Sequence, residues 1–247
     1  MRRIHVSAVI AGVVAILALV VVGPLGVSSQ QGREDASRAM SHFYGRGIAY
    51  DPEYGDREPV RYAGVRASIL LRTPDCDFRE VTDRAVFYSG DRFRIRIMPN
   101  FDAYLYLFLR EADGSGRLLF PSRQFGDGRN RVDEYTTVSI PDAGWFRFDD
   151  DPGLETIYLF ASGEPIDALE DIFDSESAGE SQGARVLRRI EELFAGRRHS
   201  RGLMYEDFSE EYDSEEAEGT SAMYFVQRYR GDVPFVARRI VLTHRPR

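Results

Sequence analysis

The sequence predicts an all-β fold class: an antiparallel β-sandwich-like domain with one inserted amphipathic helix and an N-terminal apolar export helix. Two observations lead to this prediction. Short segments of alternating or continuous apolar residues recur through most of the chain, and glycine, proline and aspartate separate them. An uncharged apolar run also stands close to the N-terminus, directly behind two arginines.

Residues 1–29 are predicted to be a signal peptide or an N-terminal membrane anchor. Arg2 and Arg3 precede a run that carries no charge, and such an arrangement keeps the N-terminus in the cytoplasm and sends the remainder across the membrane. Small residues at positions 27–29 favour cleavage, which would leave the body in the periplasm or at the cell surface. The length of the run favours retention, which would tether the body to the inner membrane by residues 6–27.

The composition is that of a folded protein and excludes several classes of site. Hydrophobic residues make up 43% of the 247 residues and charged residues 29%. All 32 basic residues are arginine, so a P-loop, a protein kinase site and a lysine Schiff base are excluded. Cys76 is the only cysteine, which excludes an intramolecular disulfide and a multi-cysteine zinc site. The net charge of −8 argues against nucleic-acid binding.

A single β-domain is expected to comprise residues 61–170 and 222–245, after a polar linker at 30–60. Within it, residues 65–70 and 92–97 alternate between apolar and other side chains, which predicts half-buried strands. Residues 104–109 form a continuous apolar run, typical of a strand that is covered on both faces. Further strands are expected at residues 85–88, 117–120, 136–140, 145–148, 156–161, 223–228 and 236–244.

Residues 171–221 interrupt this rhythm and are predicted to be an insertion into the β-domain. Residues 184–195 place apolar side chains at helical spacing and end before Gly196, which predicts an amphipathic helix. Residues 206–218 contain eight acidic side chains in thirteen positions, which predicts a solvated loop. A calcium-binding loop is the alternative interpretation, but the segment lacks the ligand spacing of known calcium loops.

The sequence shows no set of residues that makes a catalytic centre, so we expect no catalytic residues, no resident metal and no cofactor. No histidine pair has zinc-binding spacing, and no Gly-x-Ser-x-Gly elbow occurs. The candidates for a metal site or for acid–base catalysis are Asp149, Asp150 and Asp151, to which Glu155 or His244 could be added. The competing interpretation is a turn, because these aspartates precede a Pro-Gly pair.

Arg92, Arg94 and Arg96 are the candidates for ligand binding. Alternate residues of a strand point to the same face, so the three guanidinium groups could bind an anionic glycan, a phosphate or an acidic partner. The competing interpretation is a solvated strand face that discourages edge pairing, because arginine is the only strongly basic side chain that this chain uses.

Three ordered blocks of sequence resemble a known bacterial family. They are VFYSGDRFRI at residues 86–95, the segment from YLY to GRLLFP at 104–121, and the segment from IP through WFRF to PGLE at 140–155. Together they resemble the domain-of-unknown-function family numbered 4384, over about residues 65–170. The resemblance implies a small β-sandwich-like module of cell-envelope or signalling proteins, often joined to caspase-like peptidases or protein kinases. It implies no catalytic residues.

These observations predict an exported, non-catalytic β-domain of the bacterial cell envelope that serves as an accessory binding module. Its expected partner is an envelope protein or another envelope component, and contact with the membrane is expected only through an uncleaved N-terminal segment. One alternative is a hydrolase that uses the carboxylates of Asp149, Asp150 and Asp151. The other is a structural accessory that binds calcium.

Overall fold

The structure is a computed structural model, and eight segments of it are described. They are residues 39–45, 61–73, 77–123, 128–177, 187–193, 205–210, 221–229 and 233–247. The predicted export segment, residues 1–29, lies outside the described residues. Across the segments that are described, no helix has the length and apolar character needed to cross a membrane.

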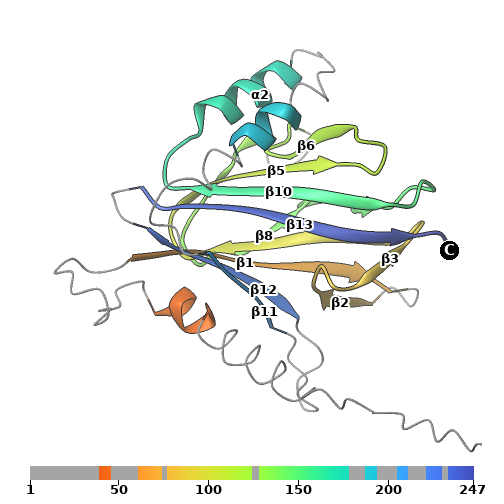
Figure 1. The fold of residues 1–247 in the computed structure, drawn as a ribbon, viewed down its shortest axis with the longest axis horizontal. Coiled ribbons are helices and arrows are strands. Elements are labelled where there is room, and N and C mark those ends of the chain that lie inside the picture. The colour runs from red at the N-terminus through yellow and green to blue at the C-terminus, as the bar shows by residue number, and fades with distance from the viewer. Residues whose placement is uncertain are drawn as a thin grey trace, which may run out of the picture.

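The described strands form two sheets, labelled in Figure 1. The seven-stranded sheet has the order β11 (Tyr205–Glu210), β12 (Ala222–Tyr229), β1 (Arg61–Arg72), β4 (Arg92–Pro99) and β8 (Val138–Ile140), with β2 (Phe78–Val81) beside β1 and β9 (Phe146–Arg147) beside β4. The six-stranded sheet has the order β3 (Val86–Tyr88), β13 (Phe235–Arg245), β10 (Leu154–Ser162), β5 (Ala103–Arg110) and β6 (Gly116–Phe120), with β7 (Arg131–Val132) beside β5. The prediction of a mostly β protein is therefore confirmed.

The inner faces of the two sheets share one apolar core. In β4 every second side chain is buried, so Phe93, Ile95 and Ile97 enter the core and the residues between them face outward. β1, β5 and β10 contribute to the same cluster, with Val65, Ile69, Leu105, Leu107, Ile157 and Leu159 among its most buried members. All strand pairs are antiparallel except β3 with β13, which run parallel.

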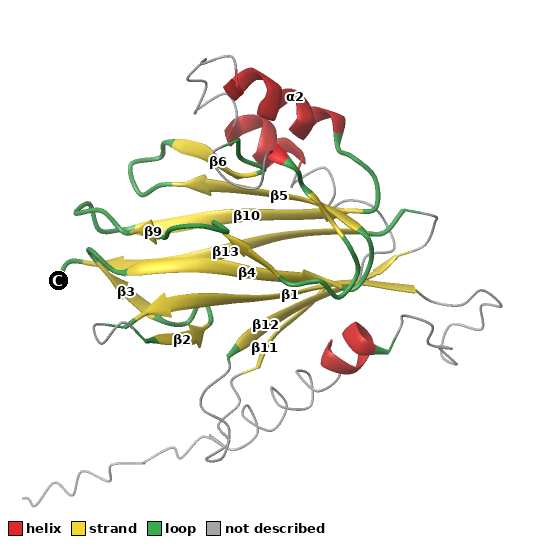
Figure 2. Ribbon diagram, turned by 180° about the vertical axis from the view of Figure 1, so that it is seen from behind, coloured by secondary structure: helices red, strands yellow, loops and turns green. Residues whose placement is uncertain are grey.

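Helices cover the outer face of the six-stranded sheet. The helix α2 (Asp167–Ser177) and a second helix at residues 187–193 lie over β5 and β6, as Figure 2 shows. Tyr106 and Phe108 of β5 are fully buried beneath apolar side chains of both helices, including Leu169 and Ile190. The continuous apolar run at 104–109 thus forms a strand that is covered on both faces, as its composition predicts.

The segment expected as an insertion differs from the prediction in two ways. A helix that was not predicted, α2, begins at Asp167, ahead of the expected insertion, and extends into it; its apolar residues Leu169 and Ile172 are buried. The acidic loop was expected at residues 206–218, but its first five residues belong to the edge strand β11. Backbone groups of β12 bind β11 whatever its side chains are, so acidic composition does not prevent pairing.

Residues 39–44, which were expected in a linker, form a short helix against the outer face of the seven-stranded sheet. Phe43 is fully buried there and meets Tyr224 edge to face, at 5.5 Å between ring centroids. Asn100 joins the helix to the sheet, since its side chain accepts a hydrogen bond from Gly64 N (2.7 Å) and donates one to Phe43 O (3.1 Å). A side chain at position 64 would collide with Phe43, 2.8 Å from a Cβ there.

The close approach of the second helix to β6 yields a test of the packing. A Cβ at Gly116 would lie 2.4 Å from Leu187 Cγ. We therefore expect Gly116→Ala to lower the free energy of unfolding by about 1–3 kcal/mol, measured by urea unfolding. The double variant Gly116→Ala/Leu187→Ala should be less destabilised than the sum of its single variants, because the second change removes the clashing atoms. If the losses of stability in the two single variants simply added up in the double variant, this contact would be contradicted.

Candidate functional site

The outer face of the seven-stranded sheet carries arginines from three neighbouring strands. Since Phe93, Ile95 and Ile97 face the core, the arginines between them face outward, and the cross-strand register places further arginines beside them. We call the resulting set the arginine face; its members are Arg66, Arg72, Arg92, Arg94, Arg96 and Arg147. Sequence periodicity predicted the three in β4, and only the register adds those in β1 and β9.

Two members of the arginine face are engaged by one carboxylate. Glu80 of β2 binds Arg96 through Oε1 and Arg66 through Oε2, the latter at 3.3 Å from Nη2. The Glu80 side chain is only 9% exposed, so the pair of contacts is shielded from water and holds β2 against the sheet. Arg96 was predicted as a ligand-binding candidate, and the structure commits its guanidinium to Glu80.

Arg94 is held by an aromatic stack. Its guanidinium carbon lies 4.4 Å from the centroid of the Trp145 ring, and its Nε donates a hydrogen bond to Gly144 O at 2.7 Å. Phe78 stacks on Trp145 with 5.2 Å between the ring centroids and is itself 51% exposed. Trp145 thus reaches from the start of β9 across the sheet to β2 and fixes Arg94 in place. Neither Trp145 nor Phe78 was predicted from the sequence to be part of a site.

The remaining three members form a row across the sheet. Arg72 of β1 is the direct cross-strand partner of Arg92, and Arg92 is the direct partner of Arg147 of β9. The guanidinium carbon of Arg72 also lies over the Trp145 ring, 6.0 Å from its centroid, so this arginine is engaged within the protein. Direct partners have Cβ atoms about 5 Å apart, and like charges at that spacing destabilise a sheet. Arg92 and Arg147 are exposed, and within the part of the chain that the structure describes neither side chain forms a hydrogen bond or an ion pair.

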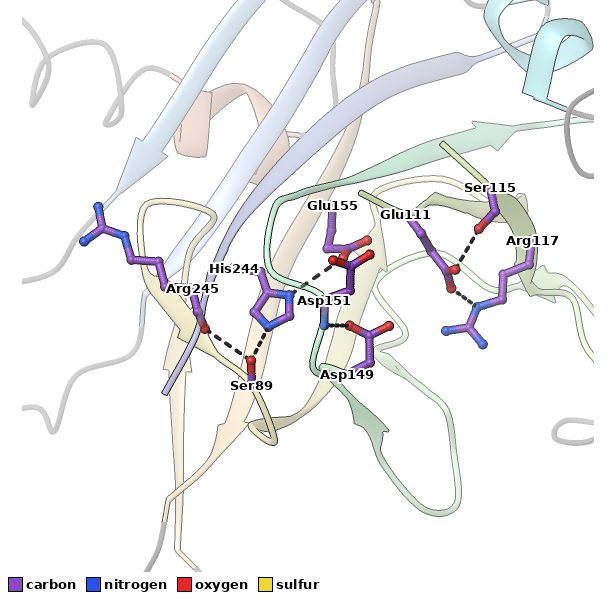
Figure 3. A network of polar contacts seen from close by, with 9 residues as sticks. All are labelled: Ser89, Glu111, Ser115, Arg117, Asp149, Asp151, Glu155, His244 and Arg245. Atoms are coloured by element: carbon purple, nitrogen blue, oxygen red, sulfur yellow. Dashed lines mark hydrogen bonds and ion pairs between the residues drawn. The ribbon is translucent and has the colours of Figure 1, made fainter. Parts of the chain in front are cut away.

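A second polar cluster, the Ser89–His244–Glu155 cluster, lies at one end of the six-stranded sheet (Figure 3). Ser89 follows β3, Glu155 belongs to β10 and His244 belongs to β13. Ser89 Oγ lies 3.1 Å from Nε2 of His244, and Nδ1 of His244 lies 3.9 Å from Oε1 of Glu155. His244 and Glu155 were predicted as possible partners in catalysis, and the structure brings them together; Ser89 was missed.

This order of groups is similar to that of a serine hydrolase, but the surrounding backbone does not complete such a site. Ser89 N donates to Arg245 O and Gly90 N donates to Phe148 O, both at 3.0 Å, so neither N–H can stabilise an oxyanion. The imidazole of His244 is fully buried, and 3.9 Å exceeds a hydrogen bond. The contacts instead join the turn after β3 to β13 and β10.

Glu155 is the electrostatically unusual member of this cluster. Burial raises the pKa of its carboxyl from about 4.5 to about 7, and the negative charges of Glu111 and Asp149 contribute to the same shift. Figure 3 shows Asp151 next to Glu155 and Asp149 further along the same turn. Oε2 of Glu155 and Nδ1 of His244 are buried and have no hydrogen-bond partner among the described residues. The cluster therefore binds a proton more readily than an exposed carboxylate does.

The three aspartates predicted as metal or acid–base candidates form a turn. Asp149, Asp150 and Asp151 are all exposed, and Asp149 Oδ1 accepts a hydrogen bond from Asp151 N at 2.9 Å. Among the described residues, no group of three histidine, cysteine, aspartate or glutamate side chains could hold a metal ion. The acidic segment at 206–218, the candidate for calcium, lies outside the described residues apart from the backbone of its first five residues.

Comparison with known protein families identifies part of this chain. Residues 86–165 match the family model described as Domain of unknown function (DUF4384). The match confirms the resemblance seen in the ordered sequence blocks. The DUF4384 segment contains Arg92, Arg94, Trp145 and Arg147, whereas Arg72 of the arginine face lies outside it. The comparisons with curated proteins and with solved structures found no match.

The raised pKa of Glu155 predicts how stability depends on pH. The native state binds the carboxyl proton between about pH 4.5 and pH 7, where the unfolded chain has lost it. The stabilisation that Glu155 provides is therefore complete below its unfolded pKa and is lost as the pH rises through about 7. Glu155→Gln should remove this loss, so its free energy of unfolding at pH 8 should exceed that of the native chain by on the order of 2 kcal/mol.

The measurement is urea unfolding of both proteins at a series of pH values. Glu164→Gln is the matched control, because Glu164 is exposed in the loop after β10 and its replacement should leave the pH profile unchanged. Parallel profiles for the native chain and Glu155→Gln would show that Glu155 titrates normally in the folded state.

Proposed function

We propose that this chain is an exported, non-catalytic antiparallel β-sandwich of the bacterial cell envelope that binds an anionic envelope component. Export is supported by Arg2 and Arg3 ahead of the apolar run, which direct the body to the periplasm or cell surface, with residues 6–27 as its tether if they are retained. The observation that carries the binding proposal is the arginine face. It gathers six guanidinium groups on one side of a chain whose net charge is −8.

The charge distribution explains why an anionic partner is favoured. A cluster of one sign on a protein of the other sign orients an approaching partner and raises its rate of association. Guanidinium groups bind carboxylate and phosphate oxygens through paired hydrogen bonds, which adds geometric selectivity to the attraction. The stack of Phe78, Trp145 and Arg94 keeps this part of the face rigid, so that little conformational entropy is lost on binding.

The described carboxylates near the arginine face form ion pairs with only two of its members. Glu80 binds Arg66 and Arg96 at one end of the face. Asp77 Oδ1 accepts a hydrogen bond from Phe78 N, and Asp142 Oδ1 accepts one from Ala143 N, so each of these aspartates caps its own local backbone. Within the described residues, no carboxylate forms an ion pair with Arg92 or Arg147, which leaves this part of the face open to an external anion.

Binding can be tested by co-sedimentation of the purified protein with envelope fragments over a range of salt concentrations. We expect Arg92→Gln/Arg147→Gln to weaken binding at least several-fold at low salt. Exposed charges such as these attract a partner through electrostatic forces that salt screens, so the effect is largest at low ionic strength. Arg188→Gln is the matched control, since Arg188 is an exposed arginine on the helix over the opposite sheet. Equal binding by the native chain and the double variant would reject the arginine face as the binding surface.

A hydrolase is the second candidate function, and the Ser89–His244–Glu155 cluster is the observation that favours it. A serine beside a histidine and a carboxylate is the arrangement that activates a serine nucleophile. Against it stand the engaged N–H groups of Ser89 and Gly90 and the full burial of His244. The binding function therefore has the stronger support.

A fluorophosphonate probe separates these two functions, because it reacts covalently with activated serines. We expect no labelling of the native chain above the level of Ser89→Ala, read by intact mass spectrometry. Stoichiometric labelling that disappears in Ser89→Ala and in His244→Gln would establish a serine hydrolase. Ser115→Ala is the control for general reactivity, because Ser115 is exposed and its Oγ donates to Glu111.

A further inference from the structure

We propose that the row formed by Arg72, Arg92 and Arg147 is a binding site for a phosphate-type oxyanion. The site lies within the arginine face, so this inference rests on the proposed function and specifies its ligand chemistry. The row combines three neighbouring strands, β1, β4 and β9, at one end of the seven-stranded sheet.

The cross-strand register places the three side chains on the same side of the sheet. The neighbouring residues Leu71, Phe93 and Phe146 are also direct cross-strand partners, and all three belong to the apolar core or pack against it. Because side chains alternate along a strand, the three arginines must then point away from the core. The row is thus set by the same pairing that builds the core, and it does not depend on the conformation of a loop.

The row is electrostatically unfavourable when no anion is bound. Like charges on directly opposed residues destabilise a sheet, and here the charge is repeated across two successive strand pairs. Within the described residues, no carboxylate pairs with Arg92 or Arg147. Glu80, which could have compensated this charge, binds Arg66 and Arg96 further along the same sheet. An oxyanion seated between the guanidinium groups would turn this repulsion into attraction.

The arrangement suits a phosphate group better than a carboxylate or a neutral sugar. A phosphate offers oxygens in several directions and can accept hydrogen bonds from guanidinium groups on more than one strand, whereas a carboxylate is satisfied by one bidentate arginine. Trp145 already stacks on Phe78 and lies under Arg94, so it is engaged in the protein's own packing and is not an open platform for a sugar ring. Inorganic phosphate and the phosphodiester of a lipid headgroup share the required chemistry.

The first experiment is thermal unfolding of the full-length protein in phosphate and in chloride at matched ionic strength. The native chain should melt a few degrees higher in phosphate, because a ligand that binds only the folded state stabilises it. Arg147→Gln and Arg92→Gln should lose most of this increase, and Arg147→Lys, which keeps the charge but loses the planar fork, should retain part of it. Arg188→Gln should retain all of it.

The same variants test the electrostatic strain directly. In phosphate-free buffer at low salt, Arg147→Gln should melt no lower than the native chain, because removing one charge relieves the repulsion in the row. A lower melting temperature for Arg147→Gln under these conditions would contradict the strain. Equal melting of the native chain in phosphate and chloride, or an undiminished phosphate effect in Arg147→Gln, would overturn the oxyanion site.

A vesicle experiment separates the two sources of phosphate. Vesicles of phosphatidylcholine alone and vesicles that also contain phosphatidylglycerol are compared for sedimentation of the native chain and Arg147→Gln. Extra binding to phosphatidylglycerol that Arg147→Gln loses assigns the site to a lipid headgroup; its absence, together with the phosphate effect on melting, assigns it to a free anion. Envelope binding without any phosphate effect would overturn this inference alone, and a phosphate effect without envelope binding would reject only the proposed function.

Discussion

The pairing of β4 with β1 is the constraint on which the rest of this structure depends. β4 sends Phe93, Ile95 and Ile97 into the core between the two sheets, and this burial sets its register. A slip by one residue would bury the arginines and expose the apolar side chains, so the register is strongly specified. The same pairing fixes the opposite face, where the arginines of β4 meet those of β1 and β9. The register of β1 and β4 therefore sets both the apolar core and the candidate ligand site on the opposite face of the sheet.

The Ser89–His244–Glu155 cluster and the row of arginines differ in the physical effect that governs their charged groups. In the Ser89–His244–Glu155 cluster, burial is the dominant effect, and it raises the pKa of Glu155 to about 7. In the row of Arg72, Arg92 and Arg147, the side chains face outward and Arg92 is directly opposed by a like charge on each neighbouring strand. The first feature is suited to joining strands within the domain, and the second to attracting an anion from outside it.

Sequence periodicity predicted much of the β framework because the alternation of apolar residues is a local signal. It located the strands of the DUF4384 segment except the two-residue strand β7, and it predicted the outward direction of Arg92 and Arg94. It missed α2, whose apolar face is short, and β11, whose pairing comes from the backbone of β12. Composition alone does not reveal an edge strand, because such a strand needs only a neighbouring strand whose backbone N–H and C=O groups are still unpaired.

The amino-acid sequence by itself determined the class of the protein, the absence of lysine chemistry and the alternation that puts arginines on one side of β4. Only the tertiary structure decided which arginines stand together. Arg72 and Arg147 are far from each other in sequence, and each meets Arg92 through strand pairing alone. The tertiary structure also decided that Arg96 is bound by Glu80, and that Ser89 meets His244. These contacts depend on register between distant strands, for which a single sequence carries no local signal.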